Sequence, residues 1–139
     1  MSEANKRLVE HFVDEFWNRG NFAAVDELMA PNAAIYLPTG ECVDPAGLKQ
    51  FAAAWRVAFP DWHSTAEELV AEGNRVAERW TGRGTHQGEL QGLSPTGKPV
   101  VTPGSVFYRT DGGRIVEFRG QVDMMSLFQQ LGVAPGAAR

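Results

Sequence analysis

Several features that would narrow the function of this chain are scarce or missing. It has one cysteine, Cys42, which excludes an internal disulfide and a cysteine-based metal site. It has no Lys/Arg cluster, and its formal net charge is −4, which disfavours nucleic acid and anionic membrane surfaces as partners. No apolar run approaches the roughly 18 residues that a membrane span requires. We therefore expect neither nucleic acid nor a membrane as a partner.

Metal-binding and targeting signals are missing as well. The three histidines are scattered and lack the His-x-x-x-His spacing of metal sites, so we expect no metal and no cofactor. No apolar stretch follows the polar residues 1–7, so we expect no secretory signal and a cytoplasmic location. The remaining composition, 43% hydrophobic and 22% charged over 139 residues, is that of one globular domain, 1–139, with a substantial core.

The first sixty residues have the periodicity of helices. Apolar side chains recur at helical spacing over residues 3–19 and again, more briefly, over residues 22–29. We expect Pro31 to stop this second helix. Residues 33–37 are a short strand candidate. Asp44 followed by Pro45 is a favourable start for a third helix, which Pro60 closes.

The period then changes to two. This alternation predicts four strands and a closing helix at 124–131, the strands being 62–72, 74–86, 99–110 and 114–122. Turn signals join them as hairpins, and a Gly-rich connection, 88–97, separates the second strand from the third. The predicted fold class is α+β, with three N-terminal helices packed on a curved, mostly antiparallel sheet and a short C-terminal helix. Such a covered, curved sheet encloses a conical pocket.

Asp123 is the candidate acid/base residue. It lies between the last predicted strand and the last helix, where burial could tune a carboxylate for proton transfer. Alternation places Arg119, Gln121 and Asp123 on one face of the strand, and we expect that face to line the pocket. The opposite assignment would make Asp123 a solvent-exposed helix cap.

Other polar residues are candidates with structural alternatives. His86 ends a predicted strand and could transfer a proton or polarise a carbonyl, or it could be a loop-edge residue bonded to the backbone. Arg119 could bind an anionic or carbonyl group of a substrate, or form a salt bridge to Glu117. Gln121 shares its face and is a second substrate-binding candidate.

Aromatic residues are the remaining candidates. Most of them are expected in the core, because helices packed on a sheet need such apolar stripes. Trp17 and Trp55 could reach the pocket and stack on a planar substrate, and Tyr36 could offer its hydroxyl. Trp80 shares a face with His86 by alternation. We count all four as substrate-binding candidates.

The order of the elements resembles the nuclear transport factor 2-like superfamily, also called the cystatin-like α+β cone. More specifically, the chain is similar to the SnoaL-like polyketide cyclase (ester cyclase) family from about residue 8 to residue 133. The segments that carry this similarity are 59–62, 70–77, 79–86, 88–89, 95–97, 108–109, 113–117, and Asp123 with 129–132.

The resemblance implies a cofactor-independent enzyme acting on a small hydrophobic substrate. In characterised polyketide cyclases one aspartate at the end of the pocket is the general acid/base of an aldol ring closure, and Asp123 matches it. Family members often carry Glu-Trp-Asp-x-Trp just upstream, whereas this chain has Phe-Arg-Gly-Gln-Val at 118–122. An aromatic pocket wall is thus expected to be replaced by Arg119 and Gln121.

Three other interpretations stay open. One is a non-catalytic module on the same fold that binds a small ligand or a protein. A limonene-type epoxide hydrolase would need an Asp-Arg-Asp arrangement, of which Asp123 and Arg119 supply part; a ketosteroid isomerase-like enzyme is the third.

The even-numbered face of the last strand, with Val116, Phe118 and Val122, would leave an apolar patch in a monomer. We therefore expect a homodimer formed through the face of the sheet.

Overall fold

The computed structural model describes residues 2–133 of the chain. Its first half contains α1 (Ser2–Phe12), which continues into the π-helical segment η1 (Val13–Asn18), then α2 (Ala24–Leu28), β1 (Met29–Tyr36), β2 (Cys42–Val43) and α3 (Pro45–Ala58). The second half contains β3 (His63–Glu72), β4 (Arg75–Thr85), β5 (Pro99–Asp111), β6 (Arg114–Val122) and α4 (Met124–Gln130). The four predicted strands and the closing helix are confirmed to within a few residues.

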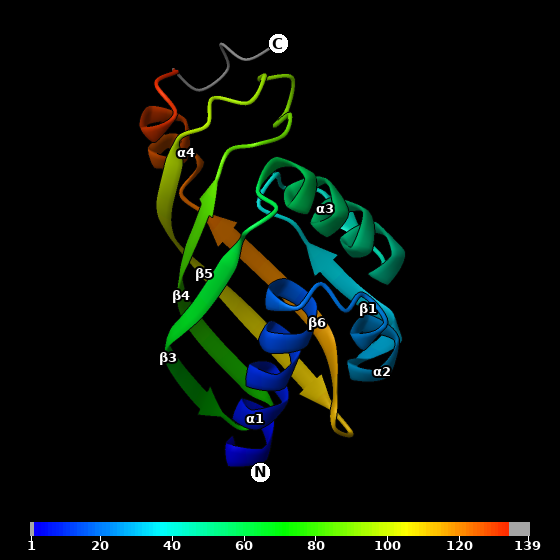
Figure 1. Ribbon diagram of the computed structural model, residues 1–139. Helices are drawn as coiled ribbons and strands as arrows, with labels where there is room; N and C mark the ends of the chain where they lie inside the picture. Colours follow the sequence, from blue (N-terminus) through cyan, green and yellow to red (C-terminus); the bar gives the residue numbers. More distant parts are fainter. Residues whose placement is uncertain (1, 134–139) are drawn as a thin grey trace.

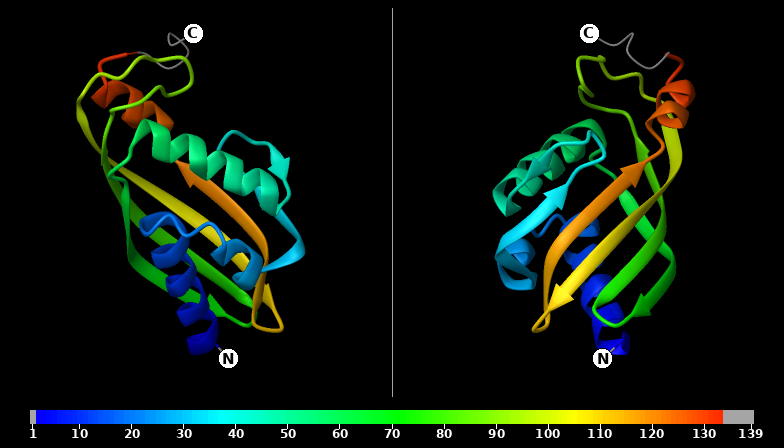
Figure 2. Two further views of the ribbon diagram at one scale, coloured as in Figure 1. Left: turned by 45° about the vertical axis from the view of Figure 1, so that its right-hand side comes forward. Right: turned by 180° about the vertical axis from the view of Figure 1, so that it is seen from behind.

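The described strands form one sheet in the order β2-β1-β6-β5-β4-β3. Strands β3 to β6 make an antiparallel meander, β1 joins β6 in parallel, and β2 pairs antiparallel with β1. Helices α1, α2 and α3 lie on one face of this twisted, curved sheet (Figure 1). Seen from behind, the opposite face has no described helix across it (Figure 2). The predicted α+β cone is therefore confirmed.

Local sequence explains where the third helix begins. Asp44 caps α3, because its side chain accepts a hydrogen bond from the Gly47 N–H at 2.9 Å, and Pro45 occupies the first turn. The region around Pro31 differs from the prediction, since this proline lies inside β1 instead of ending a helix. Pro31 falls where the pairing of β1 with β6 is irregular, between Met29 and Ala34. Its missing N–H therefore removes no hydrogen bond from a regular β-ladder.

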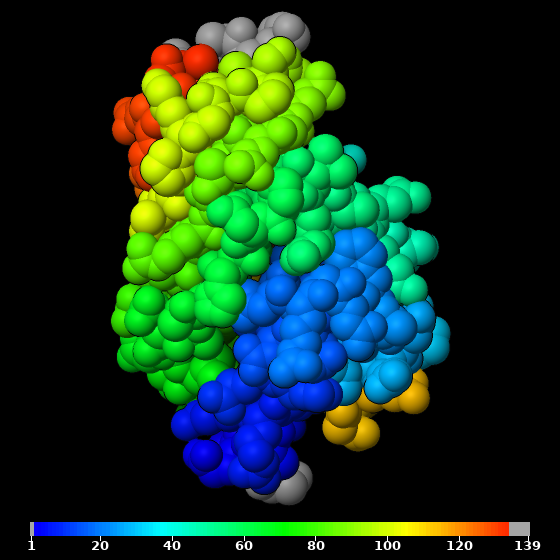
Figure 3. Space-filling model, viewed as in Figure 1, coloured from blue at the N-terminus to red at the C-terminus, as the bar shows by residue number. Residues whose placement is uncertain are grey.

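The core lies between the helices and the covered face of the sheet. Phe12 of α1 makes edge contacts with Tyr108 of β5 and Phe118 of β6, at ring-centroid distances of 6.3 and 6.4 Å. Tyr108 and Phe118 also meet edge to face at 5.5 Å. These contacts turn the even-numbered side chains of β5 and β6 toward the helices. In the space-filling view the helices and the 88–97 segment close over this side of the molecule (Figure 3).

None of the helices within residues 2–133 is both long and apolar enough to cross a lipid bilayer.

Candidate active site

An apolar cavity lies between the covered face of the sheet and the helices. It holds about 560 Å³ of empty space, including the part open to solvent. All four tryptophans of the chain line it, together with other residues from α3, η1 and the strands. Its lining is Val13, Trp17, Leu37, Pro38, Leu48, Phe51, Trp55, Trp62, Ser64, Glu78, Trp80, Val106, Phe118, Gly120, Gln121 and Val122. We call the cavity lined by these residues the inner cavity.

Two glycines make room for the indoles of the inner cavity. A Cβ atom at Gly82 would lie 2.1 Å from the Trp62 ring, and one at Gly104 would lie 2.0 Å from the Trp80 ring. Neither distance is sterically possible, so any larger residue would push an indole out of place. The aromatic wall therefore depends on the bare backbone of β4 and β5 beneath it.

Glu78 of β4 is the one carboxylate among the described residues that line the inner cavity. Its exposed fraction is 3%, and the Tyr108 hydroxyl donates a hydrogen bond to its Oε1 atom at 2.8 Å. Tyr108 is fully buried behind it, on β5. A carboxyl group thus faces an aromatic cavity with one fixed donor on one of its two oxygens.

Burial changes the acidity of both members of this pair. Loss of hydration raises the pKa of Glu78 from 4.5 to about 7, and the hydrogen bond from Tyr108 offsets part of that rise. Burial, and next the neighbouring Glu78, raise the pKa of Tyr108 well above its ordinary value. At neutral pH, therefore, Glu78 is populated in both protonation states while Tyr108 stays a donor. A carboxyl poised in this way can both accept and return a proton.

Glu78 is not among the residues predicted from the sequence, although the sequence contains a signal for it. Glu78 precedes Trp80 by two residues in a strand, so alternation puts both side chains on the same face. An acidic residue in phase with a tryptophan candidate for the pocket is a usable sign of a buried carboxylate. It was missed because charged residues in strands usually face solvent.

The predicted orientation of the last strand is wrong. Phe118 and Val122 line the inner cavity, whereas Arg119 and Asp123 are exposed and do not line it. The physical reason is that burying the Phe118 ring against Phe12 and Tyr108 requires the charged face to point outward. A register irregularity between β5 and β6 also buries Ile115 in place of Val116.

Asp123 consequently occupies the alternative position that the sequence left open. Its side chain accepts a hydrogen bond from the Ser126 N–H at 3.0 Å and caps α4. It does not line the inner cavity. Gln121, by contrast, is exposed but does line the inner cavity, as expected from the sequence.

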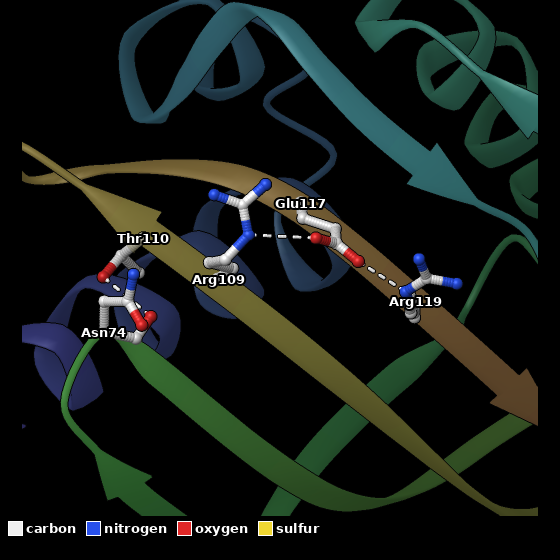
Figure 4. A network of polar contacts seen from close by, with 5 residues as sticks. All are labelled: Asn74, Arg109, Thr110, Glu117 and Arg119. Atoms are coloured by element: carbon white, nitrogen blue, oxygen red, sulfur yellow. Dashed lines mark hydrogen bonds and ion pairs between the residues drawn. The ribbon is translucent and has the colours of Figure 1, made fainter.

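Arg119 and Tyr36 lie on the uncovered face of the sheet, outside the cavity. The Glu117 carboxylate accepts hydrogen bonds from Arg109, at 3.0 Å, and from Arg119 (Figure 4). The Arg119 guanidinium also lies 3.8 Å from the centroid of the Tyr36 ring. Arg119 first and Arg109 second lower the pKa of Glu117. The alternative of a salt bridge from Arg119 to Glu117 is confirmed, and the expected place of Arg119 and Tyr36 in the pocket is wrong.

His86 is buried at the base of the 88–97 connection and does not line the inner cavity. Its Nδ1 atom accepts a hydrogen bond from the Thr96 N–H at 3.1 Å, and burial lowers its pKa. This matches the loop-edge alternative. Trp17, Trp55 and Trp80, by contrast, do line the inner cavity, as the sequence analysis expected.

The described residues contain no group of three or more His, Cys, Asp or Glu side chains that could hold a metal ion.

Comparison with known proteins gives a consistent picture. The family model described as SnoaL-like polyketide cyclase matches residues 7–131. No protein of curated function matches the chain. Among solved structures, wild-type IdmH from Streptomyces antibioticus, provisionally described as a polyketide cyclase, is 32% identical, with a TM-score of 0.84 over 93% of this chain and 99% of that one.

Two further structures extend the comparison. AclR from Streptomyces galilaeus, provisionally described as a hydroxylase, is 29% identical, with a TM-score of 0.87 over 99% of this chain and 86% of that one. A protein from Acidithiobacillus ferrooxidans, provisionally described as a polyketide cyclase, is 30% identical, with a TM-score of 0.81 over 94% and 96% of the two chains. Proteins given different activities thus share this architecture.

The raised pKa of Glu78 predicts how stability depends on pH. Between pH 4.5 and about 7, the Glu78 carboxyl keeps its proton in the folded protein and loses it in the unfolded chain. The free energy of unfolding therefore falls as the pH rises through that window. Relative to Glu78→Gln, the wild type should lose on the order of 2–3 kcal/mol of unfolding free energy between about pH 5 and about pH 8. Denaturant titrations of both proteins across this range measure the difference. Parallel pH profiles would contradict the raised pKa.

Proposed function

The chain belongs to the SnoaL-like polyketide cyclase family, and on that premise we propose that it is a cofactor-independent acid/base enzyme in which Glu78 transfers the proton. The substrate is a small hydrophobic carbonyl compound held in the inner cavity. The observation that carries this proposal is the position of one buried carboxyl, with a pKa of about 7, in an aromatic wall.

The proposed reaction is an aldol-type ring closure. The ionised Glu78 takes a proton from the carbon next to a substrate carbonyl, which leaves an enolate. The enolate carbon attacks a second carbonyl of the same molecule, so a carbon–carbon bond forms as that C=O bond becomes an alkoxide. Glu78 then returns its proton to the alkoxide oxygen. The sequence is redox-neutral and restores the starting carboxylate.

Neighbouring residues support this role. The hydrogen bond from Tyr108 fixes Oε1 of Glu78, so the other oxygen is available for proton transfer. The indoles of Trp17, Trp55 and Trp80 offer flat apolar surfaces for a planar substrate. Excluding water from such a site also keeps the pKa of Glu78 near neutrality, where a general base works best. In this proposal the acid/base residue is Glu78 and not Asp123, and His86 has a structural role.

The other activities have less support. A limonene-type epoxide hydrolase needs an arginine between two aspartates in the pocket, yet Arg119 and Asp123 both point away from the inner cavity. The non-catalytic binding module stays the alternative, because an apolar cavity can hold a ligand without transforming it. A measured proton transfer separates these two.

The proposed function predicts enzyme-dependent proton exchange. In D₂O, the protein should accelerate the loss of the C1 α-proton signals of 2-tetralone, a bicyclic ketone with one aromatic ring, as followed by ¹H NMR. Glu78→Gln should reduce that acceleration at least about 100-fold, since a positioned base contributes on this scale. Glu67→Gln, at an exposed carboxylate on β3, is the matched control and should keep the wild-type rate.

Two results would count against the assignment. Exchange that persists in Glu78→Gln would remove Glu78 from the reaction. Binding of 2-tetralone without any exchange would favour the non-catalytic module.

We also propose that the protein forms a homodimer, now through the uncovered face of the sheet. The face suggested by the sequence is wrong, because Phe118 and Val122 are covered by the helices. On the uncovered face, strand register aligns Val70, Ala77, Phe107, Arg119 and Tyr36 in one row across the sheet. Phe107 is 62% exposed and Val70 is 56% exposed. Burial of the exposed apolar side chains of this row, Val70 and Phe107, would favour self-association.

The homodimer proposal is tested by a charge in that row. Phe107→Lys should convert a dimer into a monomer in sedimentation experiments over a range of concentrations, because it would bury an unpaired ammonium group. Val57→Lys, at a similarly exposed valine on α3, should leave the dimer intact. A wild-type protein that is monomeric at every concentration would contradict the proposal.

A further inference from the structure

A second hollow adjoins the inner cavity. It holds about 520 Å³ of empty space, including open solvent, and is lined by Pro38, Thr39, Phe51, Trp55, Gln91, Val122, Met124 and Phe128. Half of these residues also line the inner cavity, namely Pro38, Phe51, Trp55 and Val122. We call this hollow the outer chamber. Its lining comes from α3, α4, the 88–97 segment, the end of β6 and the loop after β1. Of these, α4 and the 88–97 segment lie at the upper end of the molecule in Figure 1.

The register of the sheet gives the depth of the combined space. Glu78 lies opposite Val106, which lies opposite Gly120 of β6. From Gly120 the chain continues through Val122, which borders both spaces, to Met124, which borders only the outer chamber. Two strand spacings, about 10 Å, separate Glu78 from Gly120, and two residues of extended chain, about 7 Å, separate Gly120 from Val122. A ligand that reaches from Glu78 into the outer chamber is therefore elongated.

Gln91 enters the lining of the outer chamber from an unusual backbone conformation. It is the one non-glycine residue with a positive φ, 47°, in the described chain. With Gly92, at φ 88°, it forms a two-residue turn closed by the Leu90 N–H to Leu93 O bond at 3.0 Å and its reciprocal at 2.8 Å. Two positive φ values are typical of a type I′ turn, whose first position favours Asn, Asp or Gly. Glutamine is an unfavourable choice there on conformational grounds.

Packing holds this turn in place over the chamber. Leu90 is 4% exposed and belongs to the core. At the base of the segment, the N–H groups of Gln87 and Gly88 donate to Ala58 O at the end of α3, at 2.9 and 3.2 Å. Thr96 is bonded to the buried His86. The position of Gln91 is thus set by its surroundings, against its own preference.

The side chain of Gln91 is available to a ligand. Among the described residues its amide makes no hydrogen bond, whereas the Thr39 hydroxyl of the same chamber already donates to Glu41 at 3.2 Å. Most of the remaining lining of the outer chamber is apolar. Gln91 is an exposed residue that borders this chamber, and an unfavourable backbone conformation at such a border is an arrangement expected of a binding residue.

We propose that Gln91 is a specificity-determining residue whose carboxamide hydrogen-bonds an oxygen atom on the part of the substrate that occupies the outer chamber. This inference rests on the proposed function and extends it to a substrate class. The substrate is an elongated, largely apolar molecule with a carbonyl group at the end near Glu78 and a hydroxyl or carbonyl oxygen at the other end. Gln91 thereby selects for substrates that carry an oxygen atom at that end.

The test uses two probes that differ by one hydroxyl group, 4-acetylbiphenyl and 4-acetyl-4′-hydroxybiphenyl. Quenching of intrinsic fluorescence reports their binding, because all four tryptophans line the inner cavity. The wild type should bind the hydroxylated probe about three- to tenfold more tightly, which is the usual yield of one hydrogen bond. Gln91→Gly should abolish that preference and leave the affinity for 4-acetylbiphenyl unchanged.

The glycine variant suits this purpose because glycine adopts positive φ without steric cost, so the turn is retained. A thermal unfolding midpoint equal to or above that of the wild type would show that folding is intact. The proposal would be overturned by a preference that persists in Gln91→Gly, by a wild type with no preference, or by equal weakening of the binding of both probes. The same holds if neither probe binds to the wild type.

This experiment can fail independently of the proposed function. The hydroxyl preference is an equilibrium measurement that needs no turnover, whereas the proton-exchange experiment with Glu78→Gln needs no contact at Gln91. If Glu78→Gln loses proton exchange but the wild type shows no hydroxyl preference, Glu78 remains the base and Gln91 has no role in specificity. The reverse outcome would leave a binding site without acid/base chemistry.

Discussion

The hydrogen bond between Tyr108 and Glu78 joins the fold of this protein to its proposed chemistry. Both residues lie on the covered face of the sheet, and their strands are direct neighbours. The helices and the tryptophans remove water from Glu78, which raises the pKa of its carboxyl to about 7, and Tyr108 supplies the donor that makes burial tolerable. Any change that moved the aromatic wall would therefore also change the acidity of this group.

The fold could be predicted from the sequence because its signals are local. The change from helical to alternating periodicity near residue 60, the Asp44 cap and the hairpin turns each depend on a few neighbouring residues. The strand β2 was not predicted, since its two residues carry no periodic pattern. The position of Pro31 inside β1 could not be predicted from neighbouring residues, because it depends on the irregular pairing of β1 with the partner strand β6.

The site was harder to predict because it depends on which face of each strand is covered. In β6 both faces contain polar or small residues, so alternation alone did not decide between Arg119 and Phe118 as the inward side chain. The decision comes from Phe12, which is distant in sequence, and from Tyr108 on the neighbouring strand, which together bury the Phe118 ring. Once that face is fixed, Asp123 becomes a cap, Arg119 joins the outer network with Glu117, and Glu78 is left as the carboxylate in the cavity.

The most direct test of this account is a titration of the Glu78 carboxyl itself. The ¹³C chemical shift of its side-chain carboxyl carbon can be followed against pH and assigned by its absence in Glu78→Gln. The account predicts a midpoint of about 7, because burial in the aromatic cavity raises the pKa. A midpoint near the ordinary 4.5 would show that Glu78 is hydrated and would contradict its role as the proton-transfer group.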